Sequence, residues 1–440
     1  MIGLLLFIAY WVTLLAKRYS ENLFILLLQA TGCFQLVPVG LLKLDPVITK
    51  PYDWLSLIII ITLITKYRSI PIKKYLTLPV RVFFGFLAFL VFYSLIILKV
   101  EMQVVLSVFR LYLFFASPIL FINYDYKILQ KAMKPVVFLV AIGGVLFILQ
   151  AIIGTPILAS LRNDSVISKE KIGAFSRFYN LPYYGMFVLF YCVNKIVGNF
   201  NLKYFAYAGV LFVAIILSFD RNHLVAAIVG CIAVFFHNRK FKVKDFVLIV
   251  LASWIFMFAL SQMQSKRLNQ GFADIQNLSG SISLNDVGSS SDVRDLSTTQ
   301  FRAFHFSERF LYVIDKGIGT TLFGIGLVNE NSHIVTKLDF LIGLIDDQNH
   351  IVQVDTADIV WSLLLLQTGL VGIGLFIWMF VRYIKFFFKN REYTLSYLTG
   401  IYLSVLLFTS FFGIEITIPP VILFFSMMYV LTVKVTNSVA

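Results

Sequence analysis

The residues with the clearest chemical potential are charged side chains that interrupt long apolar stretches. Between residues 301 and 316, polar side chains recur at the spacing i, i+3, i+7, i+10 and i+14 (Arg302, His305, Arg309, Tyr312 and Lys316). Residues at this spacing share one face of a helix, so the pattern predicts an amphipathic helix with a narrow polar face. A face with three permanent cations, a histidine and a phenol suits a diphosphate or another polyanion. An ordinary solvated helix face is the alternative interpretation.

Three more arginines lie in or beside apolar sequence. Arg221 follows Asp220 at a tight corner between two apolar runs, and Arg110 lies inside a predicted helix. A charge this deep in a membrane segment needs a partner and indicates a functional site, although anchoring of a helix end would explain Arg221 equally well. Arg177 belongs to the segment 173–185, whose Gly, Asn and Pro residues predict a turn-like or re-entrant start to the next helix.

Acids and a histidine gather between residues 346 and 358: Asp346, Asp347, His350, Asp355 and Asp358. A carboxylate or an imidazole at this place can accept a proton as a general base. The cluster lacks the spacing of an EF-hand, an HExxH motif or a Cys/His zinc set, so we expect no metal. No Walker A or dinucleotide motif occurs, and we expect no cofactor.

The elements that must position these residues are membrane helices. Hydrophobic residues make up 59% of the chain, charged residues 14%, and the mean hydropathy is +0.86. These values predict an all-α polytopic membrane protein. Apolar windows predict about 13 transmembrane helices, near residues 2–16, 23–42, 53–66, 79–98, 103–122, 135–153, 179–197, 204–219, 222–237, 246–263, 357–381, 395–412 and 416–434.

One large polar segment divides the chain. Residues 264–356 contain 11 of the 23 acidic residues, 7 of the 37 basic ones and three of the five histidines. Backbone groups outside a helix have no partners in hydrocarbon, so this segment must lie outside the bilayer. The chain therefore divides into helices 1–10 (residues 1–263), a large loop (264–356) and helices 11–13 (357–440).

The short connections predict the orientation. Alternate connections are basic, and the positive-inside rule places them in the cytoplasm. The large loop, the 154–178 loop and the Asp220 corner then lie on the outer face. The net charge of +14 is thus an orientation signal and does not indicate nucleic-acid binding. The basic residues are Lys17, Arg18, Lys66, Arg68, Lys73, Lys74, Lys127, Lys131, Lys134, Lys195, Lys203, Arg239, Lys240, Lys242, Lys244, Arg382, Lys385, Lys389 and Arg391.

Three motifs in this order resemble a known family. They are FDRNHL at the Asp220 corner, SERFLYVIDKGIGTTLFGIG after the start of the amphipathic helix, and ADIVWSLLLLQTGLVGIG at the exit of the large loop. This arrangement resembles the O-antigen polymerase and O-antigen ligase superfamily of bacterial inner-membrane glycosyltransferases, over roughly residues 170–412. The segment GAFSRFYNLPYYG is similar to that family's Arg/Gly/Asn-Pro element.

The resemblance implies a reaction and a set of roles. A glycan on undecaprenyl diphosphate would move to a sugar hydroxyl of a second lipid-linked unit at the periplasmic face, without metal or nucleotide. A chain-length regulator protein is a possible partner. Arg221 and Arg309 would hold the diphosphate, assisted by Arg302 and Arg177, with His305 and Tyr312 also contacting substrate. Asp358 is the preferred base and His350 the second choice. Ligases typically carry histidine at the position of Asp358, so the aspartate favours the polymerase branch.

Three alternatives remain open at this point. A ligase would move finished polymer onto lipid A core, and its loss would leave polymer on the lipid carrier. A lipid-linked oligosaccharide flippase would perform no transfer, but such transporters tend to have internal repeats and short loops, unlike this chain. In a sensor or non-catalytic subunit, neutralising the arginines would leave glycan length unchanged.

Overall fold

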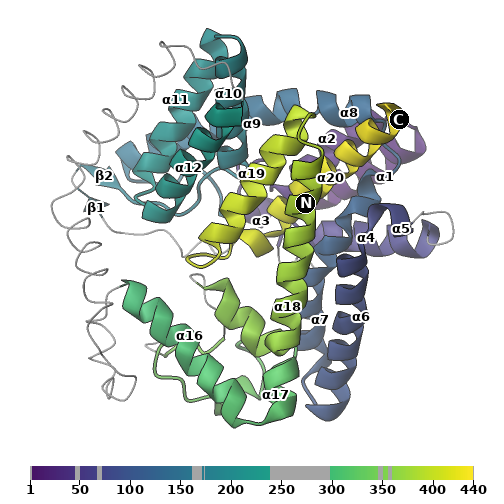
Figure 1. Ribbon diagram of the computed structural model, residues 1–440, viewed down its shortest axis with the longest axis vertical. Coiled ribbons are helices and arrows are strands. Elements are labelled where there is room, and N and C mark those ends of the chain that lie inside the picture. Colours follow the sequence, from purple (N-terminus) through teal and green to yellow (C-terminus); the bar gives the residue numbers. More distant parts are fainter. Residues whose placement is uncertain are drawn as a thin grey trace.

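The computed structural model describes residues 2–44, 50–66, 72–160, 171–172, 174–237, 298–344, 350–354 and 359–439. The predicted helix 246–263 and the predicted base Asp358 lie outside these residues. Within them the regular structure is almost entirely helical (Figure 1). A short antiparallel hairpin pairs β1 (Lys171–Ile172) with β2 (Phe175–Ser176), with Lys171 opposite Ser176.

The described residues between 2 and 153 form nine α-helices, two of which continue in another helical form. The predicted helix 23–42 is broken, because Gly32 and the three residues after it have positive φ. Pro118 lies in the second half of the predicted helix 103–122, which is 3-10 helical; proline has no N–H to donate to an α-helix. The elements are α1 (Ile2–Leu15), α2 (Tyr19–Ala30), α3 (Val39–Leu42), α4 (Asp53–Lys66), α5 (Ile72–Tyr75), α6 (Leu78–Phe92) with the π-helix η1 (Tyr93–Ile97), α7 (Met102–Leu113) with the 3-10 helix η2 (Phe114–Phe121), α8 (Tyr126–Lys131) and α9 (Met133–Ile153).

The described residues from 185 onward form three apolar helices, a pair of helices from the large loop, and the C-terminal helices. The amphipathic helix predicted from residue 301 is present as α16. The elements are α10 (Gly185–Gly198), α11 (Leu202–Leu217), α12 (Arg221–His237), α16 (Thr298–Asp315), α17 (Ile318–Phe323), η4 (Val335–Lys337), α18 (Val360–Lys389), α19 (Thr394–Thr409), η5 (Glu415–Thr417) and α20 (Pro419–Val439).

Several helices suit a lipid bilayer. Five helical segments of the described chain are long and apolar enough to cross a membrane: Leu78–Ile97, Met102–Phe121, Tyr126–Ile153, Val360–Lys389 and Pro419–Ser438. Six shorter apolar helices accompany them, namely α1, α4, α10, α11, α12 and α19. The described residues therefore fit an all-α membrane protein. They hold fewer full-length spans than the thirteen predicted, because several of the predicted helices are shorter or interrupted.

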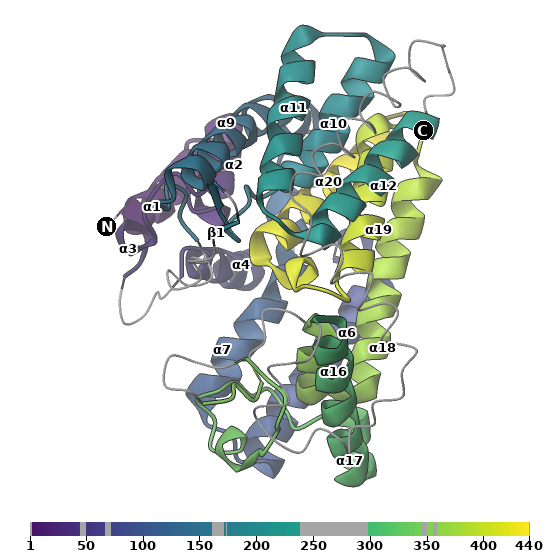
Figure 2. The same ribbon diagram turned by 90° about the vertical axis from the view of Figure 1, so that its left-hand side faces the viewer.

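Helix α18 consists of two arms that meet at Gly369, where φ is 61° and ψ is −167°. The shorter arm lies beside α16 and α17, and the longer arm extends along α6 (Figures 1 and 2). The joint packs backbone to backbone against the end of α17, where Ile325 N donates to Leu366 O at 2.7 Å. A Cβ atom on Gly369 would lie 2.4 Å from Leu322 O, and one on Gly324 would lie 2.3 Å from Leu366 O. The glycines of the two sequence motifs thus permit a close crossing that no larger residue allows.

The charge inside α7 has a partner. Arg110 Nη1 lies 3.0 Å from Asp53 Oδ2, at the start of α4. Asp53 is buried, and the same oxygen accepts a hydrogen bond from Lys50 N at 2.9 Å. The sequence required such a partner without identifying it. Pairing of this kind offsets the cost of a charge inside an apolar helix.

Contacts between connections fall into two groups. In one group, the α6–α7 connection reaches the large loop, where His333 Nδ1 lies 2.8 Å from Glu101 Oε1. In the other group, Lys434 near the end of α20 donates to the carbonyl oxygens of Ile122 (2.6 Å) and Tyr124 (2.5 Å). The first group joins connections predicted to be outer, and the second joins the end of α20 to a connection predicted to be basic and inner.

Candidate functional site

The polar face of α16 turns inward. His305 is 2% exposed and Arg309 is 0% exposed, although the sequence pattern suited a face open to ligand or solvent. Two parts of the structure cover this face: the shorter arm of α18, and the segments 338–342 and 350–354. Arg302, at the first end of the face, is only half-buried, and Lys316, at its other end, is exposed. The predicted stripe is therefore buried in its middle and accessible at its ends.

Arg309 occupies the buried middle of the stripe. Its Nη1 donates to Glu308 Oε2 at 2.9 Å and to His305 O at 3.3 Å, and its Nη2 donates to Gln353 O at 3.2 Å. The guanidinium carbon lies 4.4 Å from the centre of the Phe340 ring. Burial lowers the pKa of Arg309 to about 10, against the opposing charges of Glu308 and Glu330. The side chain is thus charged at neutral pH and is directed at protein groups.

The partners of Arg309 fix two loop segments to α16. Glu308 accepts hydrogen bonds from Leu341 N (2.7 Å) and Ile342 N (3.2 Å). The Gln353 side chain accepts from Phe340 N at 2.8 Å and donates to Phe340 O at 3.2 Å. We call Glu308, Arg309, Phe340 and Gln353 the Arg309 clamp. Its hydrogen bonds satisfy a charge that would otherwise be buried without compensation.

Tyr312 extends the clamp and is also part of the predicted substrate-binding set. Its ring packs edge-on against Phe340, with 5.2 Å between the ring centres. Lys316 Nζ lies 5.3 Å from the centre of the Tyr312 ring. In the described structure, Tyr312 therefore contributes packing to the loop.

His305 links α16 to the start of α18. Its Nδ1 lies 3.0 Å from Ser362 Oγ. Burial, together with the nearby charge of Arg309, lowers the pKa of His305 to about 3. The imidazole is therefore neutral at pH 7, and the stripe carries less positive charge than its composition indicates. Ser362 lies four residues after Asp358, so α16 approaches the part of the chain where the sequence predicts the base.

The Arg302 end of the stripe meets the connection between α19 and α20. The Arg302 guanidinium carbon lies 5.6 Å from the centre of the Phe412 ring. Trp361 Nε1 donates to Ser410 Oγ at 3.1 Å, which ties the start of α18 to the same connection. Figure 1 shows this connection between the upper end of α16 and the lower end of α12. We call residues 410–418 the bridging connection.

Asp220 organises the start of α12. Its Oδ1 accepts hydrogen bonds from Asn222 N (2.9 Å) and His223 N (3.4 Å), as a helix-capping residue does. Its Oδ2 lies 2.7 Å from His223 Nδ1. Burial alone would raise the pKa of Asp220, but His223 and the two backbone amides together hold it well below its usual range. Arg221, the first residue of α12, is exposed.

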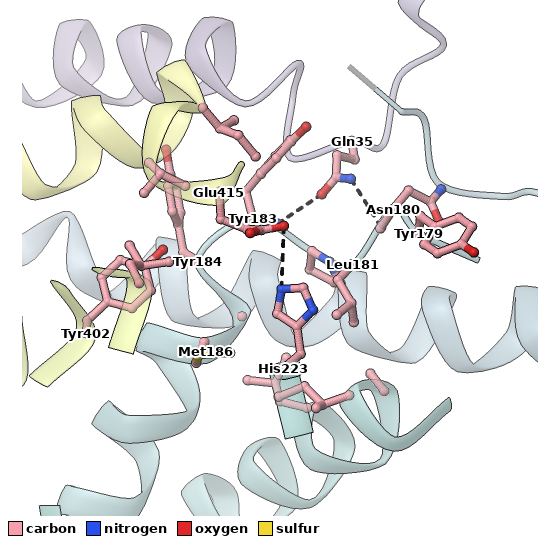
Figure 3. Close-up of a pocket in the computed structure, with 18 of the residues that line it drawn as sticks. Gln35, Tyr179, Asn180, Leu181, Tyr183, Tyr184, Met186, His223, Tyr402 and Glu415 are labelled. Carbon is pink, nitrogen blue, oxygen red and sulfur yellow. Dashed lines mark hydrogen bonds and ion pairs between the residues drawn. The ribbon is translucent and has the colours of Figure 1, made fainter. Parts of the chain in front are cut away.

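A pocket lies beside this corner (Figure 3). Its volume is about 120 Å³, and six of its polar lining residues are Gln35, Tyr179, Asn180, His223, Tyr402 and Glu415. His223 and Glu415 point toward each other across it, with 3.8 Å between Nε2 and Oε1. The pocket thus connects the Asp220 corner to the bridging connection. We call it the His223 pocket.

Residues 179–185, from the third predicted segment, also line the pocket. Gln35 Nε2 donates to Asn180 O at 3.2 Å, and Gln35 Oε1 accepts from Tyr183 N at 3.0 Å. Gln150 Nε2 donates to Asn180 Oδ1 at 2.7 Å. The turn-like start of α10 that the sequence predicted is present, since Tyr184 has φ of 67° directly before the helix. Tyr179, which lines the pocket, has the Arg177 guanidinium carbon 4.5 Å from its ring centre.

The predicted site residues therefore fall into separate groups. Arg177 and Arg221 adjoin the His223 pocket, Arg302 adjoins the bridging connection, and His305, Arg309 and Tyr312 belong to the buried side of α16. His350 is exposed after a stretch outside the described residues, and Asp358 lies outside them.

Sequence reasoning missed three polar residues of the pocket region. Gln35 and Gln150 lie in apolar sequence without any motif around them, and only the fold brings them to Asn180. Glu415 did leave a signal, because it is the lone acid between the last two predicted helices, in a connection predicted to be outer.

Comparison with known proteins does not identify a family for this chain. The chain matches no protein-family model and no curated protein. In the described part of the chain, no three His, Cys, Asp or Glu side chains group closely enough to hold a metal ion. The arrangement holds a histidine between two carboxylates beside a pocket, and an imidazole in such a place can accept a proton.

Proposed function

We propose that the protein is a membrane glycosyltransferase of the O-antigen polymerase type. It joins oligosaccharide repeat units carried on undecaprenyl diphosphate, at the periplasmic face of the bacterial inner membrane. The chain crosses the membrane about thirteen times, and residues 264–356 form a large periplasmic loop. The protein would then contribute to lipopolysaccharide biosynthesis, without a metal or a cofactor of its own.

The observation that carries the proposal is that three separate parts of the chain meet. The start of α12, the bridging connection and the start of α16 meet through His223–Glu415 and Arg302–Phe412 contacts. The start of α12 carries the FDRNHL motif, and Trp361 of the third motif donates to Ser410 of the same connection. The second motif begins on α16 at Ser307, five residues after Arg302.

The grouping of contacts supports the proposed topology. The connections assigned to the outer face contact one another, as Glu101 contacts His333. On the side assigned to the cytoplasm, Lys434 near the end of α20 contacts Tyr124 in the connection before α8. Alternating crossings of one bilayer would produce these two groups, and they would place the His223 pocket and the Arg309 clamp on one side.

The chemistry requires cations for the leaving group. When the bond between the anomeric carbon and phosphate oxygen breaks, negative charge develops on the lipid diphosphate. Arginines held near that oxygen lower the barrier, and their forked donors suit phosphate geometry. Arg221 is exposed and lies two residues before His223, while Arg177 contacts Tyr179 of the pocket and Arg302 contacts Phe412 of the bridging connection. Arg309, predicted for the same task, would act here mainly by holding the loop in place.

Glycan length in a deletion strain tests the proposal. Loss of the gene should leave lipopolysaccharide capped with one repeat unit, and the intact gene should restore the ladder. Arg221→Ala should fail to restore it with normal protein levels, whereas Lys203→Ala, which removes an exposed cation at the start of α11, should restore it fully. Long polymer stranded on its lipid carrier in the deletion strain would instead indicate the ligase. Unchanged glycan in that strain would contradict any transferase.

A further inference from the structure

Three side chains form a line at the edge of the His223 pocket. Asp220 Oδ2 lies 2.7 Å from His223 Nδ1, and His223 Nε2 lies 3.8 Å from Glu415 Oε1. Each of the three side chains is about a quarter exposed, with values between 22% and 27%. Glu415 and His223 line the pocket, whereas Asp220 lies behind the imidazole.

We infer that the His223 pocket receives the acceptor sugar and that His223, oriented by Asp220, takes the proton from its attacking hydroxyl group. This inference rests on the proposed function and deepens it. It assigns the base to His223 in place of Asp358 or His350. It also assigns the acceptor and the donor diphosphate to two adjacent regions.

The hydrogen bond to Asp220 determines which ring nitrogen is available. A carboxylate accepts hydrogen bonds, so neutral His223 carries its proton on Nδ1 and leaves the Nε2 lone pair toward the pocket. Nε2 is then the atom that can accept a proton. The negative charge of Asp220 on one side and Glu415 on the other stabilises the imidazolium that forms. A histidine held between an orienting carboxylate and its substrate is a recurring arrangement for proton transfer.

The lining of the pocket favours a neutral, hydroxyl-rich ligand over a phosphate. Among the described residues that line it there is no lysine or arginine, and Glu415 contributes a negative charge that would repel a diphosphate. Asn180, Gln35 and four tyrosines contribute polar groups and aromatic faces. Since a water needs about 10–15 Å³ of such volume, 120 Å³ holds about eight to twelve water-sized groups, comparable with one sugar ring.

The cations lie around the pocket and not in its lining. Arg221 precedes His223 by two residues, Arg302 contacts Phe412 three residues before Glu415, and Arg177 covers Tyr179. An acceptor in the pocket would therefore present its hydroxyl toward a rim rich in arginine. This separation of neutral pocket and cationic rim matches the separation between an acceptor sugar and a donor diphosphate.

The step balances without another reactant. The acceptor oxygen forms a bond to the anomeric carbon of the donor, and the bond from that carbon to the phosphate oxygen breaks. The electron pair of the broken bond stays on the lipid diphosphate. The hydroxyl proton moves to His223 Nε2 and is then released to water.

The competing explanation is that Asp220 only caps α12 and His223 only satisfies Asp220. Asp220→Asn separates the two, because asparagine caps a helix as well as aspartate does but no longer carries the charge that orients and stabilises the imidazolium. A capping role predicts normal activity for this variant. The inference predicts a loss of about 10-fold or more.

The experiment uses the full-length protein in lipid nanodiscs. The substrate is the undecaprenyl-diphosphate-linked repeat unit extracted from the deletion strain, and elongation is followed by gel. His223→Gln should lower the elongation rate about 100-fold or more while the protein melts at the wild-type temperature and binds the substrate with unchanged affinity. His350→Gln and Asp358→Asn should each retain elongation within about 5-fold of wild type.

The outcomes separate the two proposals. If the wild-type protein makes no longer product, the proposed transferase function fails. If the wild type elongates and His223→Gln elongates equally fast, or if Asp358→Asn shows the large loss instead, only the inference about His223 fails. Should His223→Gln not fold, diethyl pyrocarbonate replaces it. Modification of His223 in the folded wild type should abolish elongation and be slowed by bound substrate, and full activity of the modified protein would overturn the inference.

Discussion

Arg221 and Arg309 belong to motifs predicted to share one task, and the structure gives them opposite surroundings. Arg309 is fully buried, with three hydrogen bonds to protein oxygens and an aromatic ring against its guanidinium group. Arg221 is exposed at the start of α12, next to the His223 pocket. The comparison teaches that a cation on a polar helix face can serve the fold or the ligand, and that what covers the face decides between them.

The largest expected effect comes from breaking the Arg309 clamp. Arg309→Ala should destabilise the protein by about 3–5 kcal/mol, because it leaves Glu308 and the Gln353 carbonyl without their buried partner. Thermal unfolding in detergent measures this, together with the amount of protein in the membrane. Lys316→Ala, directly after the same helix and exposed, is the control and should unfold like the wild type. An Arg309→Ala protein of normal stability that binds the lipid diphosphate poorly would show that Arg309 serves the ligand after all.

A second change tests whether the loop is held by backbone as well as by charge. Gly369→Ala should cost about 3 kcal/mol, because its methyl group would overlap Leu322 O at a joint with positive φ. Gly374→Ala, five residues along the same helix, meets no atom within 4 Å and should be neutral or slightly stabilising. Equal melting temperatures for the two variants would mean that the crossing of α17 and α18 is looser than described.

Variants of Arg221 should show the reverse pattern, with a large loss of activity and little change in stability. Arg221→Ala should slow glycan elongation about 100-fold, the size expected when one charged donor to a developing anion is removed. Its melting temperature should stay within about 1 °C of the wild type, since the side chain is exposed. Arg221→Lys should recover part of the rate, because it keeps the charge and loses the fork. A marked drop in stability for Arg221→Ala would remove the contrast with Arg309.

The smallest effect is a pH dependence on the buried side of α16. The pKa of His305 is about 3, below the ordinary value of 6.5, so its neutral form stabilises the fold fully above pH 6.5. As the pH falls from 6.5 toward 3, this contribution is lost at about 1.4 kcal/mol for each pH unit. The melting temperature at pH 5.5 relative to pH 7.5 should therefore fall more in the wild type than in His305→Gln. Equal falls would indicate that His305 is accessible to water.

The sequence predicted much of the local structure. It identified α16, the corner at Asp220, the turn-like start of α10 and the need of Arg110 for a partner. It also gave the spacing that puts His305 and Arg309 on one face. The sequence did not predict that this face is buried. The residues that cover it, Phe340 and Gln353, lie in a segment without periodicity.

The His223 pocket shows the same limit. Asp220 and His223 stand out in an apolar context, whereas Gln35 and Gln150 look like ordinary members of apolar helices. Their function in the fold depends on contacts across more than a hundred residues, as in the Gln35–Asn180 hydrogen bond. The predicted helix lengths were wrong for a related reason. The residues after α2 that have positive φ belong to no sequence motif.

The most direct test of the proposed function is elongation by the purified wild-type protein and Arg221→Ala in nanodiscs. Both receive undecaprenyl-diphosphate-linked repeat units as the sole substrate. We predict a ladder of longer lipid-linked glycans from the wild type, and about 100-fold less elongated product from Arg221→Ala at equal stability. No ladder from the wild type, or an equal ladder from both proteins, would contradict it.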